Sequence, residues 1–303
     1  MGTAKYVMKN IFSQRGTQRD CDNGRMSGAP RATVATKSRS GHVTVLYTAP
    51  HAPPEVADDA YTALLQDLSA PEPSAVLFTS IVGLARTAAL SGLLGFVAGG
   101  SVVALAMGCG RALAVWLIDL CVLVLYHNLE FFLTARFHPG KTSVNSFLVN
   151  QSLAYQVAML AGWLEYWVEV ALFGVAAKQR AAGMAVGLAF VLMGQAVRTA
   201  AMCQAGEGFT HLVALERRER HRLCTTGVYR YLRHPGYFGW FWWSVGTQLW
   251  LCNPLCTLAY AYAAWRFFAN RIPQEEAALA DFFPDEYPAY RARTYLGIPL
   301  IST

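Results

Sequence analysis

The sequence predicts an all-α, polytopic integral membrane protein, a helical bundle with about six or seven transmembrane helices. Its 303 residues are 54% apolar and only 15% charged, and the mean hydropathy is +0.28. Soluble domains carry about 25% charged residues, so this composition indicates a multi-span membrane protein. The sequence also lacks a Gly-x-Gly-x-x-Gly fingerprint and any regular strand–helix alternation, which excludes a doubly wound nucleotide-binding fold.

Apolar windows along the chain give the predicted helices in order. A helix needs roughly 20 apolar residues to cross a hydrocarbon core of ~30 Å. The first window, residues 75–110, fits two short helices or one tilted helix. The windows that follow are residues 112–133, 151–177, 182–203, 237–251 and 255–268. Each of the last two would be only about 22 Å long, so we expect flanking residues to extend them or the helices to cross only in part.

The N-terminal segment differs from the rest of the chain in charge and pattern. Its first 50 residues carry eight Lys or Arg against two Asp, a net +6 that equals the net charge of the whole chain. It is rich in Ser, Thr, Gly and Ala and has no helical periodicity. We therefore predict a disordered basic tail over residues 1–74, near anionic headgroups, and a membrane-embedded domain over residues 75–303.

Basic loop residues predict the orientation of the helices. Six Arg lie between residues 203 and 235, whereas the preceding loop offers only Lys178 and Arg180. Because loops rich in Lys and Arg stay on the cytosolic side, the 203–235 loop should be cytosolic. A helical hairpin then returns the C-terminal tail, from Asn270 onward, to the same face.

Acidic side chains within the apolar windows need partners, because a charge at mid-membrane costs roughly 2.5 to 3.5 kcal/mol. Glu165 and Glu169 are four residues apart and share a helix face. They could line a polar cavity, pair with Arg86 or Arg198, or lie in an interfacial aromatic belt. We favour structural pairing, but a transporter would use such acids for coupling. No His, Cys, Asp or Glu set has the spacing of a metal site.

Two charged clusters border the last pair of apolar windows. Residues 227–240 set Arg230, Arg233 and His234 against an aromatic run, and Arg271 is followed by Glu275 and Glu276. A C-terminal helical hairpin would bring both clusters to one membrane–water boundary. The sequence therefore predicts a site there, where a water-soluble cofactor and a lipid-like substrate could meet.

The C-terminal third resembles the isoprenylcysteine carboxyl methyltransferase family, in order and spacing, over about 80 residues. The motifs that carry the resemblance are His221-Arg-Leu-Cys-Thr-Thr-Gly-Val-Tyr229, Arg233-His-Pro-Gly-Tyr-Phe-Gly-Trp240, Ser244-Val-Gly-Thr-Gln248, Leu251-Cys-Asn-Pro-Leu-Cys256, Trp265-Arg-Phe-Phe268, Arg271, Glu275-Glu276, Phe282-Phe283 and Glu286-Tyr287. Upstream, His127-Asn-Leu-Glu130 and Ser146-Phe-Leu-Val-Asn150 are similar to the eukaryotic branch.

The resemblance implies methyl transfer from S-adenosylmethionine to the free C-terminal carboxylate of a prenylated cysteine in CaaX-processed proteins. It assigns Arg271 to the acceptor carboxylate and Glu275 to the cofactor, as the catalytic pair. The implied cofactor-binding positions are His221, Arg222, Leu223, Cys224, Tyr229, His234, Pro235, Gly236, Tyr237 and Glu275. In animal members a cofactor-contacting Gln stands seven residues before the His221 motif, where this chain has Ala214.

The resemblance also implies the surroundings and partners. We expect an endoplasmic reticulum membrane location with a cytosolic active site, prenylated proteins of the small GTPase type and membrane lipid as partners, and no nucleic acid. Two alternatives stay open: a related membrane methyltransferase with a lipid acceptor, and a non-enzymatic transporter. Farnesyl or geranylgeranyl preference and the oligomeric state stay open as well.

Overall fold

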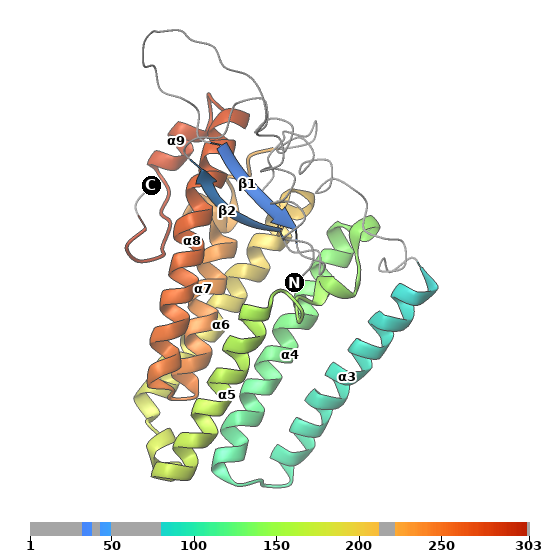
Figure 1. Ribbon diagram of the computed structural model, residues 1–303, viewed down its shortest axis with the longest axis vertical. Coiled ribbons are helices and arrows are strands. Elements are labelled where there is room, and N and C mark those ends of the chain that lie inside the picture. Colours follow the sequence, from blue (N-terminus) through green and yellow to red (C-terminus); the bar gives the residue numbers. More distant parts are fainter. Residues whose placement is uncertain (1–31, 38–42, 50–79, 212–221, 302–303) are drawn as a thin grey trace, which may run out of the picture. The chain divides into compact units, whose positions relative to one another are not determined.

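The computed structural model describes residues 32–37, 43–49, 80–211 and 222–301. The chain divides into two units, Met1–Ser69 and Ala70–Thr303. In the described part of the second unit, six long helices form a bundle (Figure 1): α3 Ile81–Ala106, α4 Arg111–Phe137, α5 Leu153–Phe173, α6 Ala181–Ala205, α7 Pro235–Trp250 and α8 Pro254–Phe282. A short helix, α9 Tyr287–Ala292, follows. The predicted helical membrane fold is confirmed.

The first unit contains a two-stranded antiparallel hairpin, β1 Ala32–Lys37 and β2 Val43–Ala49. This hairpin departs from the prediction that residues 1–74 lack regular structure. Its physical reason is the frequency of Val and Thr in both segments, since β-branched side chains favour strands. The rest of that tail lies outside the described residues, and its boundary stays a prediction.

Three helices among the described residues are long and apolar enough to cross a membrane by length and composition alone: α3, α4 and Ala181–Gly208. The window at residues 75–110 forms one helix, α3, rather than two. Helix α5 carries Glu165 and Glu169, and α7 has only 16 residues. The count of six or seven crossings therefore stays a prediction.

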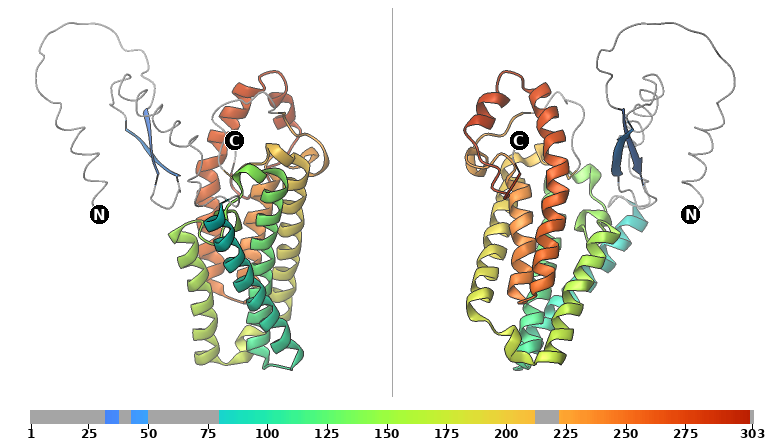
Figure 2. Two further views of the ribbon diagram at one scale, coloured as in Figure 1. Left: turned by 90° about the vertical axis from the view of Figure 1, so that its right-hand side faces the viewer. Right: turned by 60° about the vertical axis from the view of Figure 1, so that its left-hand side comes forward.

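Helix α8 is much longer than its apolar window. It has 29 residues and continues through Pro273 to Phe282, whereas the window ended at residue 268. At 1.5 Å per residue α8 measures about 43 Å against about 24 Å for α7. The predicted extension by flanking residues is thus confirmed for α8, and Figure 2 shows the C-terminal part of α8 standing beyond the start of α7.

Glycines allow α6 and α7 to pack in close contact. A Cβ on Gly194 of α6 would lie 2.5 Å from the carbonyl oxygen of Gly239 and 2.6 Å from the backbone nitrogen of Trp243. A Cβ on Gly187 would lie 2.3 Å from the nitrogen of Trp250. Real side chains do not approach backbone atoms this closely, so these positions require Gly. The contacts align the first turns of α7 with the middle of α6, and the end of α7 with the start of α6, so the two helices run antiparallel.

Gly194→Val should therefore lower the thermal unfolding temperature of the purified protein. An extra side chain between two backbones forces the helices apart and costs about 1–3 kcal/mol or more. Gly183→Val, in the same helix, is the matched control, because a Cβ there meets nothing within 4 Å. Equal unfolding temperatures for the two variants would contradict this account of the α6–α7 contact.

The two acids of helix α5 have structural partners. Glu169 forms an ion pair with Lys178, with 2.5 Å between Oε2 and Nζ. Glu165 accepts hydrogen bonds from the backbone N–H groups of Leu255 (2.8 Å) and Cys256 (2.7 Å), at the positively polarised start of α8. The pairing with Arg86 or Arg198 that we favoured is therefore wrong, because the partners are Lys178 and two backbone N–H groups. The transporter alternative thereby loses its main support.

Candidate active site

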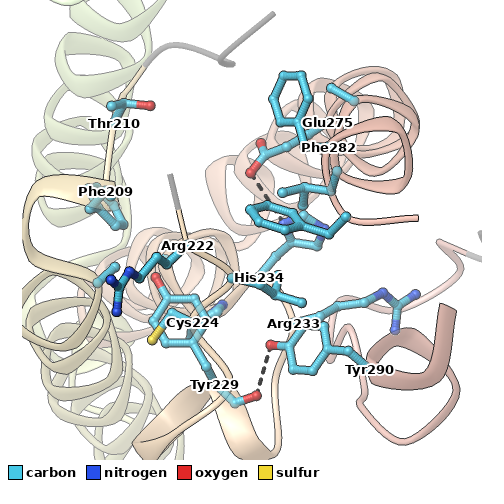
Figure 3. Close-up of a pocket in the computed structure, with 18 of the residues that line it drawn as sticks. Phe209, Thr210, Arg222, Cys224, Tyr229, Arg233, His234, Glu275, Phe282 and Tyr290 are labelled. Carbon is cyan, nitrogen blue, oxygen red and sulfur yellow. Dashed lines mark hydrogen bonds and ion pairs between the residues drawn. The ribbon is translucent and has the colours of Figure 1, made fainter. Parts of the chain in front are cut away.

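A pocket lies where α6 ends, α7 begins and α8 extends past both (Figure 3). Its empty volume is about 920 Å³, part of which is open to solvent. The residues that line it are Ala205, Gly208, Phe209, Thr210, Arg222, Leu223, Cys224, Tyr229, Arg233, His234, Pro235, Gly236, Tyr237, Glu275, Ala278, Leu279, Phe282, Phe283 and Tyr290.

The segment before α7 forms one wall of the pocket through a turn that needs glycine. Gly227 has φ +59°, and a Cβ on it would lie 2.2 Å from Oε1 of Gln204 at the end of α6. The backbone N–H of Val228 donates to the same oxygen at 2.7 Å. This contact holds the turn on α6 and brings Tyr229 and His234 to the pocket.

Helix α8 supplies the charged groups of the opposite wall. The Arg271 Nε–H donates to the Tyr237 hydroxyl at 2.7 Å, and that hydroxyl donates to the carboxylate of Glu275. His234 Nδ1 lies 3.6 Å from Glu275 Oε1, and its ring stacks on Tyr237 with centroids 5.4 Å apart. Helix α8 stays helical past Pro273, so Arg271 and Glu275 share a face. Tyr237 joins them.

Glu276 does not line the pocket but contacts two residues that do, Arg233 and His234. Its Oε1 accepts from Arg233 Nε at 2.6 Å and lies 3.3 Å from His234 Nε2, and its Oε2 lies 3.2 Å from Arg291 Nε. Burial raises the pKa of Glu276, but the hydrogen bonds from His234 and Arg233 outweigh it and lower that pKa to about 2. The carboxylate is therefore ionised at neutral pH.

Two carboxylates also control the protonation of His234. Burial lowers the pKa of His234, but its hydrogen bonds to Glu275 and Glu276 outweigh burial and raise the pKa above its ordinary value. A raised pKa means that folding favours the protonated ring. In its protonated form His234 is a cation between two carboxylates, and its contacts with Glu275 and Glu276 connect the start of α7 to α8.

His234 should make stability depend on pH with a definite sign. Its contribution is fully present below the unfolded pKa of about 6.5 and is lost as pH rises through the higher folded pKa. We expect the difference in unfolding temperature between the wild type and His234→Gln to be largest at mildly acidic pH and to shrink at alkaline pH. Thermal unfolding of both proteins across this range checks it, and a difference independent of pH would contradict it.

The structure brings together the predicted cofactor-binding residues except one. All of them except His221 line the pocket, and His221 and Ala214 lie outside the described residues. Arg271 does not line the pocket but bonds to Tyr237, which does. In the described part of the chain no three His, Cys, Asp or Glu gather as a metal site.

Several lining residues were not predicted from the sequence. Ala278, Leu279 and Phe282 follow Glu275 at three, four and seven residues, so helical periodicity could have found them. Arg233 and Phe283 belong to the quoted motifs without having been given a role. Phe209 and Tyr290 carry no signal in the sequence, because tertiary contacts alone bring them to the pocket.

The arrangement suits a ligand that carries a positive charge and a flat ring. Burial raises the pKa of Glu275, but its bonds with His234 and Tyr237 and the charge of Arg271 hold that pKa below the ordinary value. The wall around this carboxylate includes aromatic rings, and the Tyr290 hydroxyl donates to the carbonyl oxygen of Tyr229 at 2.8 Å. An anion beside aromatic faces can bind a cation and stack on a ring.

Comparisons with known proteins agree on one family. The model of the isoprenylcysteine carboxyl methyltransferase (ICMT) family matches residues 186–281. A protein-S-isoprenylcysteine O-methyltransferase of Xenopus laevis is 40% identical over 210 residues, 66% of this chain and 72% of that protein. The Homo sapiens protein of that name is 45% identical over 182 residues, 60% of this chain and 64% of that protein.

A solved structure is similar as well. It is described as the eukaryotic intramembrane Ras methyltransferase ICMT, and it superimposes with a TM-score of 0.67 at 36% sequence identity. The match covers 73% of this chain and 77% of that chain. The similarity therefore extends beyond the pocket to most of the bundle.

Proposed function

This chain belongs to the isoprenylcysteine carboxyl methyltransferase family, and we propose that the pocket between α6, α7 and α8 is where it methylates the C-terminal carboxylate of a prenylated cysteine. Family membership makes the chain a membrane methyltransferase of isoprenylcysteine proteins. One observation supports this location of the reaction most directly. Helix α8 brings Arg271 and Glu275 to the two sides of one hydroxyl, that of Tyr237.

The proposed methyl donor is S-adenosylmethionine, and the charge and the aromatic rings of the pocket support this choice. When bound, this cofactor supplies an electrophilic methyl group on a positively charged sulfonium. The ionised Glu275 offers the opposite charge, and Tyr229, Phe282 and Tyr290 offer ring faces for a base. Pro235 and Gly236 begin α7 at the pocket, so backbone groups can approach a ligand closely there.

The proposed role of Arg271 is to place the acceptor carboxylate. An α-carboxyl group has a pKa near ~3.5, so it is ionised at neutral pH and needs no general base. The Arg271 guanidinium donates from Nε to the Tyr237 hydroxyl and from Nη2 to the carbonyl oxygen of His211. Those bonds fix its plane, and the remaining N–H donors suit a carboxylate in fork geometry.

The pocket residues can contribute to catalysis in two ways: they hold the donor and the acceptor in alignment, and they exclude water. A reaction between two groups held near ~3 to 3.5 Å gains from proximity. The walls formed by Leu279, Phe282 and Phe283 reduce the water around the reacting charges. Arg271 would therefore orient the acceptor, and Glu275 would hold the donor.

We also propose the partners of the protein, the side of the membrane on which its site lies, and its location. Prenylated proteins of the small GTPase type would reach the site with the prenyl chain in the lipid, so that membrane lipid is a second partner. The six Arg of the 203–235 loop support a cytosolic site. An endoplasmic reticulum location rests on the family resemblance.

One assay tests the proposal. Membranes carrying the protein are given labelled S-adenosylmethionine and N-acetyl-S-farnesyl-cysteine, and base-labile methyl ester is measured. We expect ester on this acceptor and essentially none on N-acetyl-cysteine, because lipid partitioning of the prenyl chain supplies much of the binding. Equal labelling of both acceptors would contradict the proposal, and label on phospholipid instead would favour the lipid-acceptor alternative.

A further inference from the structure

A buried ion pair lies behind the pocket, between Glu130 of α4 and Arg198 of α6. Their exposed fractions are 1% and 6%. Arg198 donates from Nε to one carboxylate oxygen and from Nη2 to the other at 3.0 Å, a two-pronged fit. Neither residue lines the pocket, and the methyl transfer described above uses neither.

The same guanidinium contacts two residues that do line the pocket. Arg198 Nη1 donates to the carbonyl oxygen of Gly236 at 3.1 Å, in the first turn of α7. Its carbon Cζ lies 5.8 Å from the ring centroid of Phe209. Phe209 in turn packs so closely on Gly236 that a Cβ there would lie 2.8 Å from the ring. Arg198 therefore holds two parts of the wall together.

A third contact leads from the ion pair to Arg271. His211 Nε2 lies 2.8 Å from Glu130 Oε2, so the ring N–H donates to the carboxylate. The backbone carbonyl oxygen of His211 accepts from Arg271 Nη2 at 2.5 Å. Because the side chain and the carbonyl belong to one residue, anchoring the ring limits where the carbonyl points. Glu130 thus reaches Arg271 through His211.

We propose that Glu130, Arg198 and His211 are positioning residues, which set the direction of the Arg271 guanidinium and so the placement of the acceptor carboxylate. Tyr237 holds Arg271 from the side of α7, and His211 holds it from the loop after α6. Two bonds from different elements fix a plane that a single bond would leave free to rotate. The inference rests on the proposed role of Arg271 toward the acceptor.

His211 is the residue to test, since its removal leaves the buried pair intact. Changing Glu130 or Arg198 would leave an unpaired buried charge and endanger the fold. The His211 side chain is 30% exposed, so His211→Ala removes one bond without that penalty. His211→Gln is the conservative variant, because its amide N–H can reach as far as Nε2.

We expect His211→Ala to lower kcat/KM for N-acetyl-S-farnesyl-cysteine roughly 10- to 100-fold, since small misplacements cost that much. The dissociation constant for S-adenosylmethionine should stay within about twofold, and His211→Gln should recover most of the loss. An unchanged kcat/KM, a loss confined to donor binding, or a failure of Gln to restore activity would each overturn the inference.

A double-mutant comparison of His211 and Arg271 distinguishes a positioning role of His211 from a purely structural one. Acceptor dissociation constants are measured with S-adenosylhomocysteine present, so that no turnover is needed. Arg271→Ala should weaken acceptor binding, and adding His211→Ala should weaken it no further, whereas additive effects would contradict coupling. A wild type that methylates no prenylcysteine would refute the proposed function itself, which is a separate outcome.

Discussion

Arg271→Ala should lower turnover of the prenylated acceptor by roughly 100- to 1000-fold, the loss typical when a group that aligns the reacting charge is removed. The guanidinium is already oriented by Tyr237 and His211, so its loss removes a prepared carboxylate partner. Donor binding should change by less than about twofold, because Glu275 and the aromatic wall remain. Steady-state kinetics with N-acetyl-S-farnesyl-cysteine and calorimetric titration of the donor measure the two effects.

Arg266→Ala is the matched control for this prediction. Arg266 lies on the same helix five residues earlier, and its side chain is exposed. It carries the same charge, so any general effect of removing a cation from α8 would appear in both variants. Turnover should stay near the wild-type value. Equal losses in the two variants, or wild-type turnover in Arg271→Ala, would remove Arg271 from the site.

Glu275→Gln should weaken donor binding by roughly 30-fold or more, since breaking a buried, hydrogen-bonded charge contact typically costs 2 kcal/mol or more. Gln keeps the shape of the side chain and can still accept from Tyr237, so the charge is the main change. The negative charge that would face the cationic donor is lost. Titration of the purified protein with S-adenosylmethionine measures the change in dissociation constant.

The control for Glu275 is Asp281→Asn, which removes an exposed carboxylate from the same helix. Its donor affinity should match that of the wild type. If Glu275→Gln bound the donor as tightly as Asp281→Asn does, the proposed donor site would be wrong. Together with Arg271→Ala, these variants assign the donor and the acceptor to separate residues of α8.

The apolar windows predicted most of the helices, because each segment inside a membrane must form its backbone hydrogen bonds within itself. A segment in lipid must satisfy its own backbone groups, so a run of about 20 apolar residues forms a helix. The windows for α4 and α6 agree with the structure to within a few residues. The polar C-terminal part of α8 was harder to predict from the sequence, because the apolar pattern of this helix stops near Phe268. Glu276, which binds Arg233 and Arg291, helps to hold that polar end in place.

The sequence by itself determined the spacing of Arg271 and Glu275 on one helix face, since the helical repeat fixes neighbours three and four residues apart. It also determined the motif residues that resemblance could transfer. Only the tertiary structure decided which helices face one another, through glycine contacts such as Gly194 with Gly239. Only it could join Glu130 to Arg198 and His211, since bonds between residues about 70 or 80 positions apart depend on packing that no local pattern encodes.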